Sequence, residues 1–376
     1  MSKKKKVLIV VDPFQYGGSD LVAIRLQQAL DKNLFECTYC VHHGEEIGPL
    51  ESYVASTGVR IIRQPKNSLG YINSYRYYLE LFKKEHFDIV HCHLPFYSGI
   101  VMAAAYKFNI GKRIAHSHFS QPLIFEGQKN KQIILNIYRS VMRSVINRFA
   151  TDVIGCSKEA GEYLCGKHGF KKKGIVLNNG IYTKKYEFNL EKRNSVRKKL
   201  HIQNKTVLGH IGQMYYVKNH EFLIDVFYEY QKKNSNSVLL LVSDGPDRKK
   251  LEKKTEMLGI KNKVLFLGFR NDVPDLLLAM DCFIFPSIHE GFPLTLIEAQ
   301  ATKLPCVVSD SIIKDVKLNN NFFFVSLKSN TNVWCSAIDR AMAYSRDDID
   351  NSNVIKEFDI NHVVKKLEYI YLKDQV

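Results

Sequence analysis

Residues 281–301, DCFIFPSIHEGFPLTLIEAQA, contain the pattern that decides the fold. The apolar run 281–287 predicts a short strand, and the apolar spacing over 294–304 predicts a helix. Glu290 then falls in the loop at the carboxyl end of the strand, and Glu298 falls about two turns into the helix. Ligands of open α/β sheets bind at that end, so we expect both acids to accept hydrogen bonds from a hydroxyl-rich ligand. The plain alternative is a loop acid and a solvated helix acid.

The rest of the chain repeats this alternation of short apolar runs and helical stretches. Such alternation is typical of βαβ units and a parallel sheet. We therefore predict an α/β protein with two facing Rossmann-like domains and an interdomain cleft, and we place the domains at 1–185 and 200–350. The polar stretch 183–197 is the predicted linker. Within residues 355–376, an amphipathic helix at 360–372 is expected to pack back on the first domain.

The individual elements follow from the same patterns. In the first half, strands are predicted at 7–11, 35–41, 59–62, 89–93, 112–116, 152–156 and 174–178. In the second half they are predicted at 206–211, 238–242, 264–267, 282–285 and 305–308. The clearest helices are 17–30, 72–84 and 131–149. With 376 residues and 45% hydrophobic content, the chain is long enough for two domains with sizeable cores.

Composition also indicates where the protein works. No apolar run is long enough to span a bilayer, and the amino terminus lacks the cleavage pattern of a signal peptide. The eight cysteines lie in or beside apolar runs, which indicates reduced thiols and a cytoplasmic protein. Cys37 and Cys40 form a CxxC in a strand-like run without a second ligand pair, so we predict no metal there.

Positive charge is concentrated in the first half of the chain. The net charge is +16, and residues 1–190 carry 27 Lys and Arg against 15 Asp and Glu. The helix at 131–149 places Arg139, Arg143 and Arg148 among apolar residues. This pattern favours an anionic membrane surface as a partner, with solubility alone as the plain alternative. Nucleic acid is not expected, because no base-reading module or aromatic platform accompanies the charge.

A glycine loop follows the first predicted strand of the second half, in Gly212-Gln-Met-Tyr-Tyr-Val-Lys218-Asn-His220. The glycine lets backbone N–H groups approach an anion, the helix start adds partial positive charge, and Lys218 adds a full one. This is the layout of a phosphate site, and a structural turn is the alternative.

A second glycine pair, Gly17-Gly18, ends the loop after the first strand and opens a helix through Ser19 and Asp20, which are good caps. The pair is not a dinucleotide fingerprint, because no third glycine follows at the required spacing. Close approach to a ligand in the cleft and a tight turn without a ligand both remain open.

Two histidine pairs, His91-Cys-His93 and His116-Ser-His118, also fall at strand ends. An imidazole there can hold a substrate hydroxyl or stabilise charge near a reacting carbon. We expect one histidine of each pair to point inward as a packed residue. Zinc is not expected, because no carboxylate cluster accompanies the four histidines.

Taken in order, these pieces resemble the family 4 retaining glycosyltransferases of GT-B architecture, and in particular their bacterial capsular and exopolysaccharide branch. The motifs that carry the resemblance are Gly17-Gly18, 88–93 (DIVHCH), 113–118 (RIAHSH), 155–157 (GCS), 178–181 (NNGI), 212–218, 243–246 (SDGP), 266–272 (FLGFRND), Pro286-Ser287 and 290–298. They span nearly the whole chain.

The resemblance implies a retaining, metal-independent hexosyltransferase that needs no cofactor. Such an enzyme moves a sugar from a nucleotide-diphosphate donor, with a UDP-sugar favoured, to a growing, lipid-linked cell-surface polysaccharide. It implies an acceptor-side first domain, a donor-binding second domain, and action in the cytoplasm at the inner face of the cell membrane. The departing donor phosphate itself would deprotonate the acceptor hydroxyl.

Site roles are carried over by resemblance, position by position. Glu298 would hold the ribose, Glu290 and His118 would face the donor sugar, and Lys218 with Gly17 and Gly18 would hold the diphosphate. The base pocket would be lined by Gly268, Phe269 and Arg270. The remaining expected donor-binding residues are Gly212, Gln213, Gly291, Phe292, Pro293 and Leu294.

One position departs from the family pattern. Where the family has Arg directly after the loop glycine, this chain has Gln213. The change removes a charge-assisted contact, typically ~1.5–3 kcal/mol for a hydrogen bond to a charged group. Arg270 is a candidate to compensate. The alternative is a catalytically weakened sugar-nucleotide-binding or scaffold protein of the same fold.

Overall fold

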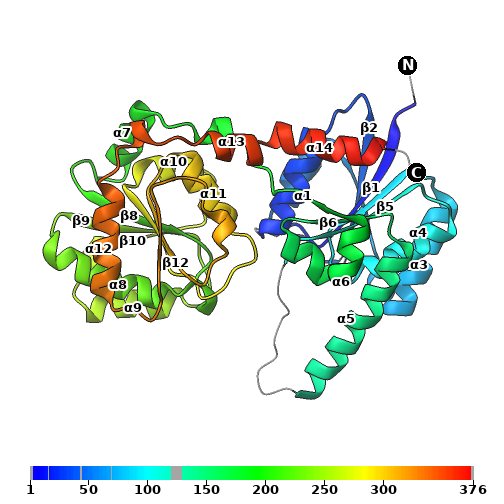
Figure 1. Ribbon diagram of the computed structural model, residues 1–376, viewed down its shortest axis with the longest axis horizontal. Helices are drawn as coiled ribbons and strands as arrows, with labels where there is room; N and C mark the ends of the chain where they lie inside the picture. Colours follow the sequence, from blue (N-terminus) through cyan, green and yellow to red (C-terminus); the bar gives the residue numbers. More distant parts are fainter. Residues whose placement is uncertain (1–2, 16, 43–44, 69, 120–128, 374–376) are drawn as a thin grey trace. The chain divides into compact units, whose positions relative to one another are not determined.

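The computed structural model describes residues 3–15, 17–42, 45–68, 70–119 and 129–373. The chain forms two compact units, each a parallel sheet covered by helices (Figure 1). Unit 1 contains the chain up to Gly180 and again from Ile360 onward, and unit 2 contains Ile181–Asp359. Each unit has its own buried core. Two Rossmann-like units with parallel sheets confirm the predicted fold class.

The sheet of unit 1 has the strand order β3-β2-β1-β4-β5-β6-β7, and its neighbouring strands pair in parallel. The order reverses between β1 and β4, which makes their carboxyl ends the switch point where α/β proteins bind ligands. The strands are β1 (Lys5–Val11), β2 (Phe35–Val41), β3 (Arg60–Arg63), β4 (Ile89–Cys92), β5 (Lys112–Ser117), β6 (Asp152–Gly155) and β7 (Gly174–Val176).

Helices connect these strands, and the last helix of the chain returns to this unit (Figure 1). They are α1 (Gly18–Ala29), α2 (Glu51–Ser56), α3 (Tyr71–Lys84), α4 (Ser98–Lys107), α5 (Lys129–Phe149), α6 (Lys158–Lys173) and α14 (Ile360–Leu372). α14 packs against α1, and its inner face buries Val363, Leu367 and Tyr371. Because buried positions recur at helical spacing, the amphipathic pattern of this segment is explained by packing within unit 1.

The sheet of unit 2 has the order β10-β9-β8-β11-β12-β13, again with parallel neighbours. Its switch point lies between β8 and β11. The strands are β8 (Thr206–Ile211), β9 (Ser237–Val242), β10 (Val264–Gly268), β11 (Cys282–Phe285), β12 (Cys306–Ser309) and β13 (Phe322–Val325). The helices are α7 (Leu190–Lys199), α8 (His220–Lys233), α9 (Arg248–Met257), α10 (Val273–Ala279), α11 (Leu294–Ala301), α12 (Thr331–Met342) and α13 (Ser352–Phe358).

Burial on both faces explains why the strands were recognisable from the sequence. β9 and β11 are buried along their whole length, so their sequences SVLLLV and CFIF are nearly continuous apolar runs. Our strand prediction missed β13, whose sequence FFFV follows the polar turn around Asn319. The parallel pairing of β13 with β12 supplies its partner, which the local sequence does not reveal.

The predicted linker at 183–197 is wrong. This stretch contains a short 3-10 helix, Thr183–Tyr186, and most of α7. Its charged residues are used inside unit 2: Arg193 donates to the carbonyl oxygens of Leu278 and Met280 at 2.7 and 2.8 Å. These carbonyls lie at the carboxyl end of α10, where helices leave their last acceptors unpaired. The polar residues of this stretch therefore belong to a helix that packs on unit 2 and caps α10. The two units divide between Gly180 and Ile181 instead.

Candidate active site

The loops after β8 and β11 meet at the switch point of unit 2. The backbone N–H of Ile288 donates to the carbonyl oxygen of Val217 at 2.8 Å. The side-chain amide of Asn219 donates to the carbonyl oxygen of Pro286 at 3.2 Å. These bonds fix the glycine-lysine loop against the loop that carries Glu290.

An ion pair crosses this switch point. The Nζ of Lys218 lies 2.6 Å from Oε1 of Glu290, and the two side chains are 21% and 14% exposed. The ammonium also lies 5.3 Å from the centre of the Phe285 ring. Two residues singled out separately from the sequence, 72 positions apart, therefore form one polar centre. Ion pairs with limited water access stay paired more firmly than exposed ones.

Gly212 lies where a side chain would not fit. A Cβ at this position would come within 2.9 Å of His210 Nε2 and 3.4 Å of Lys218 Cδ. The glycine therefore lets the loop lie directly on His210, as a close-packed backbone requires. Gln213, next to it, is half-buried.

The acidic segment after β11 continues into α11. Gly291 and Phe292 are half-buried in the loop, and Phe292 stacks on Phe358 with ring centres 5.5 Å apart. Pro293 is the residue that precedes the helix and Leu294 is its first residue. Glu298 is the fifth residue of α11, so it lies one turn into the helix and not two.

Glu298 is only 5% exposed. The alternative of a solvated helix acid is therefore wrong. Acidic side chains are almost never buried to this extent unless polar groups surround them, so this position has a role inside the protein.

The loop after β10 contains the three residues expected at the base pocket. Gly268 has a positive φ of 66°, a conformation that favours glycine. Phe269 is 52% exposed. Arg270 makes two hydrogen bonds, of 2.8 and 2.6 Å, to the carboxylate of Asp272. Because a carboxylate already balances it, the Arg270 charge is not free to replace the family arginine at Gln213 without leaving Asp272.

Gly17 and Gly18 lie at the carboxyl end of β1 in unit 1. Gly17 is the residue that precedes α1, and no side chain caps this helix. The prediction that Ser19 and Asp20 are caps is therefore wrong. A Cβ on Gly18 would meet no atom within 4 Å, so nothing within the described part of unit 1 requires a glycine there.

Asp20 has a different role. Its Oδ2 accepts a hydrogen bond from the backbone N–H of Gln15 at 3.2 Å, and the side chain is buried. Burial is the main cause that raises the pKa of Asp20 to about 7. A carboxyl that titrates near neutrality beside the switch point is a functional candidate, whereas the sequence pointed to Asp20 only as a helix cap.

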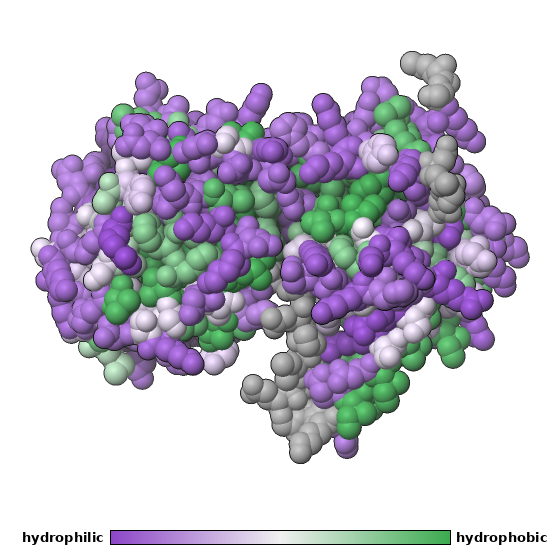
Figure 2. All heavy atoms as spheres, viewed as in Figure 1, coloured by the Kyte–Doolittle hydropathy of each residue, from purple (hydrophilic) through white to green (hydrophobic). Residues whose placement is uncertain are grey.

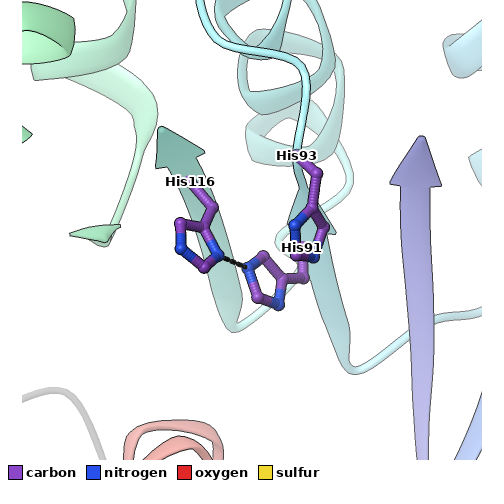
Figure 3. Close-up of side chains that lie close together, drawn as sticks. All are labelled: His91, His93 and His116. Atoms are coloured by element: carbon purple, nitrogen blue, oxygen red, sulfur yellow. Dashed lines mark hydrogen bonds between the residues drawn. The ribbon is translucent and has the colours of Figure 1, made fainter. Parts of the chain in front are cut away.

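The four histidines of β4, β5 and the residues after them form one cluster, which we call the histidine ladder. Its members are His91, His93, His116 and His118. His91 Nε2 lies 3.1 Å from His116 Nδ1 (Figure 3). His93 Nδ1 lies 2.9 Å from His118 Nε2. All four are buried, so the expectation that only one of each pair points inward is wrong. Side chains two apart on neighbouring parallel strands share a face, which brings all four rings together.

Burial keeps the histidine ladder neutral. It lowers the pKa of His91 to about 3 and that of His118 to about 4, and it holds the pKa values of His93 and His116 well below the usual range. The neighbouring imidazoles add to the effect in His91, His93 and His116. At neutral pH the ladder therefore offers hydrogen bonds and no charge. His91 Nδ1 lies 2.7 Å from the hydroxyl of Tyr371, so α14 fixes one end.

His91, His93 and His116 are also the residues that could hold a metal ion. Each offers a ring nitrogen, and these nitrogens lie within 4.8 Å of one another (Figure 3). In the described residues the facing nitrogens of His91 and His116 instead bind each other. A metal would have to break that bond, since each ligand nitrogen must present a lone pair to the ion.

The basic character of α5 differs from the expectation. Arg139 is buried, and Arg143 donates to the carbonyl oxygen of Tyr163 at 2.9 Å. Both therefore serve the interior of unit 1. Arg148 is exposed near the end of the helix, and apolar side chains are exposed as well: Ile134 and Ile137 are 67% and 59% exposed. Figure 2 shows apolar and polar side chains together on this helix. None of the helices in the described ranges has the length and apolar character to cross a bilayer.

Two Rossmann-like units, each with a parallel sheet, are the architecture of the GT-B class, and a lysine, a glycine loop and acids lie at the switch point of one of them. A family model described as "Glycosyltransferase Family 4" matches residues 16–185, and one described as "Glycosyl transferases group 1" matches residues 191–342. The chain belongs to the family 4 glycosyltransferases of group 1.

Three relatives are each 27% identical to this chain. Putative glycosyltransferase EpsF of Bacillus subtilis matches 92% of this chain and 90% of its own length. The capsular polysaccharide biosynthesis glycosyltransferase CapH of Staphylococcus aureus matches 98% of both. UDP-Gal:alpha-D-GlcNAc-diphosphoundecaprenol alpha-1,3-galactosyltransferase of Escherichia coli matches 87% of both.

A solved structure confirms the architecture. Anabaena HepE, crystallised in complex with UDP-glucose, has a TM-score of 0.78 to this chain at 19% identity, over 96% of this chain and 98% of its own. At this identity the similarity establishes the fold.

Proposed function

We propose that this glycosyltransferase is a hexosyltransferase that transfers a sugar, with retention, from a UDP-sugar to a growing, lipid-linked cell-surface polysaccharide. The observation that carries the proposal is the Lys218–Glu290 pair at the switch point of unit 2. A cation beside a glycine loop suits a diphosphate, and a carboxylate beside it suits sugar hydroxyls. The enzyme needs no metal or other cofactor in this scheme.

The proposed roles are those that the family resemblance assigns to each residue. Lys218 and the Gly212–Gln213 backbone hold the diphosphate, Glu290 faces the sugar, and Glu298 accepts hydrogen bonds from the ribose. The loop of Gly268, Phe269 and Arg270 lines the base. In unit 1, the resemblance assigns Gly17 and Gly18 to the phosphates and His118 to the sugar.

The proposed reaction leaves proton transfer to the donor. The acceptor oxygen attacks the anomeric carbon, the bond from that carbon to the phosphate oxygen breaks, and the departing phosphate takes the hydroxyl proton on the same face. Electrostatic stabilisation of the departing diphosphate is then the main contribution of the protein.

Relatives support the donor and the acceptor. The E. coli relative is named for UDP-Gal and a diphosphoundecaprenol-linked acceptor, CapH is named for capsular polysaccharide, and HepE was crystallised with UDP-glucose. We therefore place the enzyme at the inner face of the cell membrane.

A ligand panel tests the donor class. Thermal shifts should be largest with UDP-sugars and UDP, smaller with GDP-sugars, and absent with free sugars. Radiolabelled turnover of the best donor then separates a catalyst from a scaffold. Donor binding with neither hydrolysis of the donor nor transfer to lipid-linked or glycan acceptors would favour the catalytically weakened alternative that Gln213 suggests.

The ribose role has its own test. Glu298→Ala should weaken UDP binding about tenfold or more, because charge-assisted hydrogen bonds contribute ~1.5–3 kcal/mol. Glu256→Ala is the matched control, since its carboxylate is exposed and pairs with Lys261 at the surface of unit 2. Unchanged UDP affinity in Glu298→Ala, measured calorimetrically on a folded protein, would remove the role.

We also propose that the exposed face of α5 rests on an anionic bilayer near the acceptor. Ile133, Ile134, Ile137 and Val141 are 50–67% exposed along this helix. Such a face binds by partial insertion, and the excess of positive charge in the first half of the chain adds attraction to anionic headgroups. Exposed apolar side chains are the main feature of this surface, because Arg139 and Arg143 point into unit 1 and only Arg148 of the three predicted arginines is exposed.

Vesicle co-sedimentation tests this surface. The protein should sediment with phosphatidylglycerol vesicles and less with phosphatidylcholine vesicles. The double variant Ile134→Ser/Ile137→Ser should lose binding, whereas Met257→Ser, at a 79% exposed apolar position of unit 2, should keep it. Equal sedimentation of all three proteins would contradict the proposed surface.

A further inference from the structure

The charges around the proposed diphosphate site nearly cancel. In the described loops after β8 and β10, Lys218 is paired with Glu290 and Arg270 is paired with Asp272. Gln213 contributes no charge. The diphosphate of a nucleotide-sugar donor brings two negative charges to this site, so the loop needs positive charge beyond what these pairs leave. Helix dipoles and backbone N–H groups provide only partial charge.

Two histidines lie directly beneath the glycine loop. His210 in β8 and His220 at the start of α8 are 0% and 3% exposed, and their ring centres are 4.7 Å apart. His210 Nε2 lies 2.9 Å from the place where a Cβ on Gly212 would be. The pair is therefore in contact with the loop backbone that faces the proposed phosphates.

The hydrogen bonds of His210 and His220 show which of their ring nitrogens can accept a proton. His210 Nδ1 lies 2.8 Å from the carbonyl oxygen of Ile284, and a carbonyl only accepts, so Nδ1 carries the proton and Nε2 is a bare acceptor. His220 contacts the Gly212 backbone, but within the described residues no hydrogen bond of normal geometry reaches either of its nitrogens. Unpartnered buried nitrogens are unfavourable, so the pair is ready to take a proton or a hydrogen bond.

Without a ligand both rings are neutral. Burial is the largest cause that lowers the pKa of His220 to about 4, and Lys218 lowers it further. Burial and His220 hold the pKa of His210 well below the usual range. A dianion on the loop acts in the opposite direction, since nearby negative charge favours the protonated imidazole. His220 is the more exposed ring and has the smaller barrier to overcome.

The other charged groups near the pair are few. Lys218 opposes protonation, and Glu290 reduces that opposition through the ion pair. From the strand β11, His210 contacts the carbonyl oxygen of Ile284 and the apolar rings of Phe283 and Phe285, and none of these groups carries a charge. On α8 itself, Glu221 and Asp225 are paired with Lys250 and Lys254 of α9.

We propose that binding of the donor diphosphate is coupled to uptake of one proton from solvent by the His210–His220 pair, with His220 as the first acceptor. This inference rests on the proposed function, since it takes the glycine loop as the diphosphate site. The protonated pair supplies, beneath the loop, the positive charge that Gln213 does not supply beside it.

Calorimetry tests the proton directly. UDP-glucose is the probe, because its phosphates are both esterified and do not titrate between pH 6 and 8, whereas the terminal phosphate of UDP titrates near 6. Binding at pH 7 is measured in phosphate and in Tris buffer, whose heats of ionisation differ. We expect net uptake of up to one proton, and a dissociation constant that falls by up to about tenfold per pH unit from pH 8 to 6.

Variants assign the proton to the pair. His220→Asn should abolish proton uptake and flatten the pH dependence, and His210→Asn should reduce both. His201→Asn is the matched control, because His201 is an exposed histidine of unit 2 with a φ of 55°, which Asn tolerates. It should behave like the native protein.

Opposite results overturn the inference in distinguishable ways. Binding heats that do not depend on the buffer, with UDP-glucose still bound, would refute the coupling and leave the proposed function intact. Uptake that persists in His220→Asn and His210→Asn but is lost in Glu290→Gln would assign the proton to the carboxylate and refute the pair. If neither UDP-glucose nor any nucleotide-sugar binds, the proposed function itself fails.

Discussion

The carboxyl edges of the two sheets handle buried polar groups in different ways. The edge of unit 1 holds the histidine ladder, which is fully buried, neutral and bonded largely to itself. The edge of unit 2 holds Lys218 and Glu290, a charged pair that remains partly exposed. Burial disfavours charge unless a partner or water compensates it. The degree of burial at each sheet edge therefore decides whether its polar groups are neutral or charged. Unit 1 offers shape and hydrogen bonds, and unit 2 offers charge.

The largest effect should come from acidification. The pKa values of His91 and His118 are about 3 and about 4, below the ordinary 6.5, so the folded state binds fewer protons than the unfolded one. Stability from these groups is present above pH 6.5 and is lost as the pH falls toward those values. At pH 5 the loss is about 2 kcal/mol for each such histidine. Unit 1 has four buried histidines in its ladder and should lose more than unit 2.

Urea unfolding at pH 7.5 and pH 5 measures this difference. Trp334, the single tryptophan of the chain, lies in α12 and reports unit 2, whereas circular dichroism reports both units. A midpoint that shifts further by circular dichroism than by fluorescence is the expected result. Equal shifts by the two probes would remove the contrast between the units.

The substitution Lys218→Met removes the cation of the Lys218–Glu290 pair in unit 2. Donor binding should weaken by about ten- to a hundredfold, which corresponds to ~1.5–3 kcal/mol for a hydrogen bond to a charged group. Lys261→Met is the matched control, because Lys261 belongs to an exposed pair of unit 2. Isothermal titration with UDP compares the three proteins. A similar loss in both variants would mean that the effect is general charge and not the site.

The glycine loops offer a third test. Gly212→Ala should lower the free energy of unfolding by about 1–3 kcal/mol, because its Cβ would press on His210. Gly18→Ala should change stability by less than about 0.5 kcal/mol, since its Cβ meets open space. If ligand phosphates approach Gly18, this second variant should still lose transfer activity. Full activity in Gly18→Ala would contradict a ligand role for that glycine.

The smallest effect is expected when a cation is added beside the glycine loop of unit 2. Gln213→Arg restores the cation that the family has, and UDP should bind about tenfold more tightly, or ~1.4 kcal/mol. Gln213→Lys is the control for charge without the bidentate fork of arginine. No gain in either variant would show that the loop already balances the diphosphate by other means.

Much of the fold was predictable because its strands are buried on both faces. Segments such as β2, β8 and β11 carry apolar runs bounded by polar turns, and the predicted ranges match the observed strands. The linker and β13 were not predictable in this way. Arg193 and Arg197 make α7 strongly polar although both cap a neighbouring helix, and β13 depends on its pairing with β12.

The site was predictable in its members and not in its pairings. The sequence identified Lys218, Glu290 and Glu298 from their positions after strands, and it identified all four ladder histidines. It missed Asp20 as a buried acid and His210 as a group beneath the loop. The spacing of His91 with His93 and of His116 with His118 was a usable signal, since residues two apart on adjacent strands share a face.

By itself the sequence determined the class of fold, the family and the positions of the chemistry, because hydrophobic periodicity and glycine placement are local properties of the chain. Only the tertiary structure decided which groups meet: Lys218 with Glu290, His91 with His116, and His220 with His210. It also decided which of them carry charge. Protonation depends on burial and on neighbours brought from distant parts of the chain, and neither is encoded in any short stretch of residues.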